Sequence, residues 1–210
     1  MTGRLYGALG MAGVGASLLA LIALHVLDPD RSVMDETISE YALGEYGWLV
    51  SVNDVVLGVG MIAIALGLRQ TLAPGKRVTA AWVFLLIVGL GFLAAAAFET
   101  DPRGAAESTT SGAIHGTAAL VSVLSLAIAA WLLRGVFTRD ANFQHLARMQ
   151  VWFAILITLG VVALVVLFEV GPAGLIQRLL VVVMASWLFV LAANLRHVET
   201  TRYATGRNAE

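Results

Sequence analysis

Apolar residues along the chain gather into six long runs separated by short polar segments. Each run has about the 20 residues that an α-helix needs to cross the ~30 Å hydrocarbon core of a bilayer. The runs are Leu5–Leu27, Trp48–Leu68, Thr79–Phe98, Ala113–Leu133, Met149–Phe168 and Gln177–Leu195. Membrane β-strands would instead be segments of about 10 residues with alternating polarity. The pattern therefore predicts an all-α integral membrane protein, a six-helix bundle built as one domain over residues 1–210.

The composition agrees with a lipid environment. Hydrophobic residues make up 59% of the chain and charged residues 13%, against about 25% charged in soluble domains. The absence of cysteine excludes structural disulfides, thiolate nucleophiles and Cys-based metal sites. The first run is longer than the apolar part of a signal peptide and no typical cleavage site follows it, so we expect a retained helix. The expected partner is membrane lipid, and nothing indicates a nucleic acid.

Basic residues collect on one side of the predicted spans. Ten of the 13 fall on the side of the chain termini, and the other three are Arg31, Arg103 and Arg178. By the positive-inside rule, we expect both termini to be cytoplasmic. We also expect the protein to lie in the plasma (inner) membrane. Lys76 is the only lysine, a coding bias that suggests a GC-rich bacterial genome. The polar tail from Arg196 onward is expected to fray.

The first outer loop, residues 28–47, carries the pattern of a short helix. Ser32-Val33-Met34-Asp35 resembles a capping box. Apolar side chains then recur at helical spacing, and Gly44 is a natural stop. These apolar side chains are Met34, Ile38 and Tyr41. We therefore expect a short helix that lies on the outer membrane surface.

Asp54 stands about six residues inside the second run, roughly 9 Å below the outer surface at 1.5 Å per residue. A carboxylate there is costly and is either functional or a structural hydrogen-bonding centre. Other polar side chains come at the same outer end of their runs. The predicted ligand-binding set is Ser39, Glu40, His25, Asp54, Asp101, His115, Gln177 and Arg178. We expect an outer polar pocket that binds a lipid headgroup or a small molecule.

Two other interpretations stay open. In the first, the protein is a lipid hydrolase or transferase that uses Asp54, Asp101 and His115. Zinc held by His25, His115 and Asp101 could activate water in such an enzyme, although the chain has no H-x-x-x-H or H-E-x-x-H motif. A haem held between His25 and His115 is supported only by the matching depth of the two residues in the membrane. In the second, the polar cluster only locks the bundle, and Arg178 extends to lipid phosphates.

Several short motifs resemble the bacterial six-span membrane family called domain of unknown function 998. They are I-S-E-Y-A-L-G-E-Y-G-W-L from Ile38, F-E-T-D-P from Phe98, G-A-I-H-G from Gly112, and G-L-I-Q-R-L from Gly174, with Trp187. The resemblance covers residues 5 to 198 and implies polar motifs on the extracytoplasmic side, without implying a reaction. The corresponding positions are Ser39, Glu40, Asp101, His115, Gln177 and Arg178, with His25 added.

Within the F-E-T-D-P motif, Glu99 stands where the family usually has proline. The family looks related to the group of the autophagy modulator DRAM and the yeast Sfk proteins. A looser likeness connects the chain to zinc-dependent membrane hydrolases such as alkaline ceramidases. Their last helix has an H-x-x-x-H pair, whereas the last run here is followed only by His197.

Overall fold

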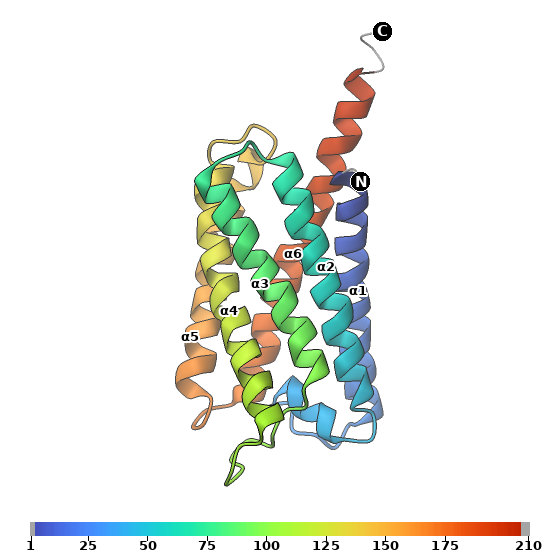
Figure 1. Ribbon diagram of the computed structural model, residues 1–210, viewed down its shortest axis with the longest axis vertical. Helices are drawn as coiled ribbons and strands as arrows, with labels where there is room; N and C mark the ends of the chain where they lie inside the picture. The colour runs from blue at the N-terminus through green and yellow to red at the C-terminus, as the bar shows by residue number, and fades with distance from the viewer. Residues whose placement is uncertain (1–2, 207–210) are drawn as a thin grey trace.

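Six long helices make up most of the described part of the chain (Figure 1). The computed structural model describes the backbone of residues 3–206 and the side chains of residues 3–198. The helices are α1 (Gly3–Leu27), α2 (Trp48–Thr71), α3 (Lys76–Ala97), α4 (Thr110–Phe137), α5 (Ala147–Leu167) and α6 (Ala173–Gly206). Each is long and apolar enough to cross a membrane. The prediction of an all-α, six-span membrane protein is confirmed.

The helices form a ring in chain order. Each packs against its neighbours in sequence, α6 returns to α1, and α6 also contacts α2. One end of the bundle carries the loops 28–47, 98–109 and 168–172, and we call it the acidic end (Figure 1). The other, basic end carries the start of α1 and the end of α6. Beyond Arg196, where we expected fraying, α6 continues as a helix to Gly206 and projects past the other helices.

Glycines allow α1 and α2 to cross closely. A Cβ atom added to Gly13 would lie 2.6 Å from the carbonyl oxygen of Val56 and 2.8 Å from Cα of Gly60. Both separations are shorter than real Cβ contacts, so only glycine fits at this crossing. Close backbone approach of this kind replaces the hydrophobic effect, which does not drive helices together in lipid.

The first loop at the acidic end contains a short 3₁₀ helix, η1 (Ile38–Leu43). The Ser32–Asp35 segment does not start it, because there the Ser32 hydroxyl accepts from the Asp35 amide at 3.2 Å and closes a separate turn. Ile38 and Tyr41 are buried against α1 and α2. The short helix is therefore tucked into the end of the bundle, and its position relative to a membrane surface stays a prediction.

Candidate functional site

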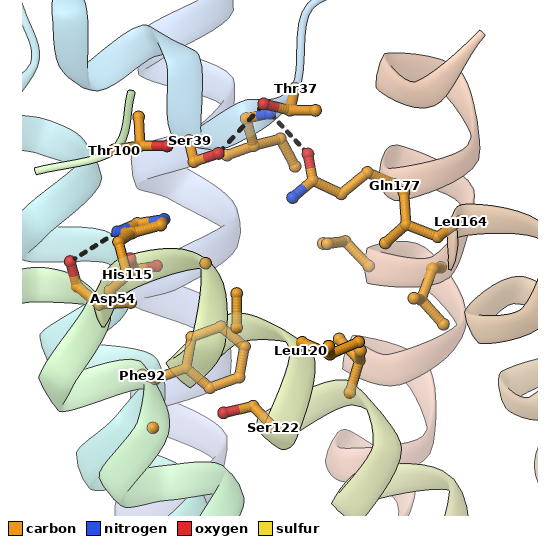
Figure 2. A pocket seen from close by; sticks show the side chains of 18 of the residues that line it. Thr37, Ser39, Asp54, Phe92, Thr100, His115, Leu120, Ser122, Leu164 and Gln177 are labelled. Carbon is orange, nitrogen blue, oxygen red and sulfur yellow. Dashed lines mark hydrogen bonds between the residues drawn. The ribbon is translucent and has the colours of Figure 1, made fainter. Parts of the chain in front are cut away.

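A cavity of about 480 Å³ occupies the acidic half of the bundle. All six helices line it, together with residues 37–39 and Thr100. Figure 2 shows Thr37, Ser39, Thr100 and Gln177 toward the loops, and the deeper part is lined by Phe92, Leu120 and Ser122. The cavity thus has a polar rim and a mainly apolar interior.

Asp54 lies in the wall of this cavity with only 8% of its surface exposed. The Ser17 hydroxyl donates to Asn53 Oδ1 at 2.6 Å, and the Asn53 amide donates to Asp54 Oδ1 at 2.9 Å. Within the described side chains, Asp54 forms no salt bridge and its second oxygen accepts no hydrogen bond. Asp54 is therefore held in position through Oδ1, and its Oδ2 is available to a further hydrogen-bond partner.

His115 lies in the same cavity wall and is 6% exposed. Its Nδ1 faces two backbone carbonyl oxygens, Phe98 O at 2.9 Å and Ala95 O at 3.1 Å. Because a carbonyl oxygen only accepts, Nδ1 carries the proton. Nε2 has no hydrogen-bond partner among the residues that the structure describes. In the neutral imidazole this nitrogen is an acceptor, so His115 offers the cavity a fixed acceptor.

Gln177 closes the rim from the start of α6. Its Oε1 accepts from the Ile38 backbone amide at 2.6 Å, which identifies the other terminal atom as the amide nitrogen. That nitrogen points into the cavity (Figure 2) and has no partner in the described part of the chain. Ser39 also lines the rim and is hydrogen-bonded to Thr37 at 3.0 Å. Of the eight predicted ligand-binding residues, four line the cavity: Ser39, Asp54, His115 and Gln177.

His25 and Arg178 form a separate cluster that anchors the first loop. The Arg178 Nε–H donates to His25 Nε2 at 2.9 Å. The same guanidinium donates to the carbonyl oxygens of Glu36 at 2.8 Å and Val33 at 3.1 Å, and to the Tyr41 hydroxyl at 3.2 Å. These contacts tie α1, the loop and α6 together, and neither His25 nor Arg178 lines the cavity.

Glu40 joins the first loop to the second. Its Oε2 accepts from the backbone amide and the hydroxyl of Thr37 at 2.7 and 2.9 Å, and its Oε1 accepts from the Arg103 amide at 3.1 Å. Glu40 thus lies at the edge of a second, shallower pocket between the two loops. Its oxygens are already occupied by the chain itself.

Asp101 organises the loop that leads into α4. It accepts from the Thr109 hydroxyl at 2.7 Å, the Thr109 amide at 2.8 Å and the Ser108 hydroxyl at 3.0 Å. The Thr109 hydroxyl, the Thr109 amide and the Ser108 hydroxyl lower the pKa of Asp101 below its ordinary value, with the Thr109 hydroxyl contributing most. Thr109 in turn caps α4 by accepting from the Gly112 amide. These contacts give Asp101 a role in positioning the start of α4, and it does not line the main cavity.

The comparison with protein families decides where this chain belongs. The model for "Protein of unknown function (DUF998)" matches residues 11–194. The chain belongs to this family. No curated protein and no solved structure matches it.

In this DUF998 member the polar motifs separate into those that face the cavity and those that hold the loops. Among the described side chains, no three His, Cys, Asp or Glu residues lie close enough to share a metal ion.

Two buried polar residues, Ser17 and Gln150, were missed by the sequence analysis. The Gln150 side chain is buried, accepts from the Trp187 indole at 2.7 Å and donates to Ala130 O at 2.8 Å. An isolated polar residue inside an apolar run was the available signal for both.

Proposed function

We propose that the cavity of this membrane protein binds the polar group of a lipid or of a small amphipathic molecule. The observation that carries the proposal is that three side chains lining one cavity each have a polar atom without a partner among the described residues: the second carboxylate oxygen of Asp54, Nε2 of His115 and the amide nitrogen of Gln177. Polar groups left without a partner in an apolar interior are destabilising. A bound polar group relieves that cost.

The identity of these atoms sets the chemistry of the ligand. The Asp54 oxygen and the His115 nitrogen both accept hydrogen bonds or a positive charge, whereas the Gln177 amide donates. A ligand that satisfies all three carries a hydroxyl or ammonium donor and also an acceptor oxygen. The cavity volume of about 480 Å³ falls within the ~300–1,000 Å³ usual for small-molecule sites.

The first experiment is mass spectrometry of lipids and small molecules that co-purify with the protein in mild detergent. We expect one class to be enriched over bulk lipid and to fall about tenfold or more in Asp54→Asn, the size expected for a hydrogen bond to a charged group. Asp140→Asn is the matched control, because Asp140 lies in the loop at the basic end. Bulk lipid alone, in the same proportions in both variants, contradicts the proposal and favours a purely structural polar cluster.

A second candidate function is hydrolysis or transfer on a lipid ester. The fixed Nδ1–H of His115 is the observation that favours it, because it leaves Nε2 free to act as a general base. In hydrolysis, Nε2 would take a proton from water as the water oxygen bonds to the ester carbonyl carbon. The ester C–O bond then breaks, and the leaving oxygen receives that proton. Release of fatty acid from a ¹⁴C-labelled phospholipid, abolished in His115→Gln, tests this function.

We also place the acidic end on the extracytoplasmic side of a bacterial plasma membrane. Ten of the 13 basic residues are on the side of the termini, and cytoplasmic ends carry this excess. The ligand would then be reached from the outer half of the bilayer.

A further inference from the structure

The inner face of α5 changes its surroundings halfway along the helix. Toward the basic end, Gln150, Ala154, Ile157 and Val161 are buried at helical spacing. The stripe continues with Leu164, Val165 and Phe168, which line the cavity. Val165 is 51% exposed. Val161 is 3% exposed, so this face of α5 is less covered one turn further on, at Val165.

The face of α4 that contacts α5 toward the basic end lines the cavity toward the acidic end. The Trp131 indole donates to the Thr158 hydroxyl of α5 at 2.9 Å, which joins the two helices toward the basic end. Leu120 lies about three turns before Trp131 and shares its face of α4. It lines the cavity and is 44% exposed. On α5, Val165 lies about two turns beyond Thr158 on the corresponding face.

Gly116 leaves open space beside this part of the seam. It lies about one turn from Leu120 on the same face of α4 and also lines the cavity. A Cβ atom added there would meet no atom within 4 Å. Leu120, Gly116 and Val165 are thus at once cavity wall and outer surface, so the cavity is continuous with the side of the bundle.

We propose that this seam between α4 and α5 is a lateral portal, and that the ligand is a bilayer lipid whose hydrocarbon chain lies in it. The inference rests on the proposed function and adds the ligand class and the route of entry. The portal opens between two membrane-spanning helices and has apolar walls. At that level the bundle is surrounded by the hydrocarbon chains of lipids. A hydrocarbon chain in the seam would cover Val165, which is 51% exposed.

The alternative route is the rim at the end of the bundle, between Ser39, Thr100 and Glu169. A water-soluble ligand would use it and would need no opening through the side. The two routes therefore differ in which residues an acyl chain touches and in which variants block binding.

The test uses cells that express the protein and incorporate a diazirine fatty acid into all their acyl lipids, so that no headgroup is assumed. After irradiation, cross-linked peptides are identified by mass spectrometry. We expect adducts at Leu120 and Val165 and, deeper, at Phe92 and Met184. In Gly116→Trp the adducts at Phe92 and Met184 should fall about tenfold, because the indole fills the portal. Gly15→Trp is the matched control, since Gly15 on α1 also has open space around it and does not line the cavity.

Unchanged adducts at Phe92 and Met184 in Gly116→Trp overturn the portal. If Gly116→Trp does not fold, Leu120→Trp replaces an already exposed side chain and makes the same test. A ligand that is lost in Asp54→Asn but kept in Gly116→Trp contradicts the portal and leaves the proposed function standing. Failure of the proposed function is different: there, no ligand is enriched and the deep residues carry no adducts in the wild-type protein.

Discussion

The Arg178 guanidinium and the His25 imidazole meet at 2.9 Å, Nε–H to Nε2, although 153 positions separate them in the chain. His25 Nδ1 lies 2.6 Å from the Leu21 carbonyl oxygen, so Nδ1 carries the proton and Nε2 is free to accept from Arg178. Three further hydrogen bonds from Arg178 hold the first loop against the bundle. Through this contact the loop that forms the cavity rim is fastened to both α1 and α6.

Arg178→Ala should release the first loop. Loss of hydrogen bonds from a charged donor is expected to lower the free energy of unfolding by about 2 kcal/mol or more and to speed proteolysis within residues 28–47. Arg178→Lys should restore little, because one ammonium group cannot reproduce the planar fork of donors. Thermal unfolding in detergent and timed proteolysis measure both effects.

The control for this substitution is Arg103→Ala. Arg103 lies at the same end and makes one side-chain hydrogen bond, to Phe168 O at 3.2 Å. Its contact with Glu40 uses the backbone amide and survives the change. Equal losses in the two variants would show that Arg178 does not fasten the loop in particular.

Gly13→Ala should destabilise the crossing of α1 and α2. The added methyl would lie 2.6 Å from Val56 O and 2.8 Å from Gly60 Cα, and overpacking of this kind costs about 1–3 kcal/mol. Gly15→Ala meets no atom within 4 Å and should be neutral or stabilising by up to ~1 kcal/mol, from helix propensity. The melting temperatures of the two variants in the same detergent test this prediction. A Gly13→Ala variant as stable as Gly15→Ala would contradict the close crossing.

Acidification should loosen the start of α4 through Asp101. Its pKa in the folded protein lies below the ordinary value, so the folded state favours the carboxylate. The stability it contributes is present above the unfolded carboxyl pKa, near pH 4, and is lost as the pH falls through the folded value. Hydrogen exchange at Gly112 and Ala113 should therefore accelerate below about pH 4 once intrinsic rates are removed. Asp101→Asn should abolish that pH dependence, whereas Glu107→Gln, at an exposed position of the same loop, should leave it unchanged.

The orientation is testable because the chain has no cysteine. Glu107→Cys and Lys76→Cys each place a single thiol at an exposed position, at the acidic and basic ends respectively. In intact cells, a membrane-impermeant maleimide should label the Glu107 variant and leave the Lys76 variant unlabelled until the membrane is opened. The reverse pattern would falsify the extracytoplasmic placement of the acidic end.

The number and approximate limits of the spans follow from the sequence by itself. Backbone groups in lipid must be satisfied within a segment, so an apolar run of sufficient length forms a helix without reference to its neighbours. The limits of the runs also predict that Asp54, His115 and Gln177 lie near the same end of the bundle. Local hydropathy determined these features.

Only the tertiary structure decided which of those residues share a cavity. Helix order around the bundle and the direction of each side chain depend on packing between distant segments, which one sequence does not reveal. Packing turned Asp54 and His115 toward the same space, whereas the contacts of Arg178 with His25 and of Asp101 with Thr109 fasten the loops. Packing likewise decided that Leu120 of α4 and Val165 of α5, which lie far apart in the sequence, line the same cavity.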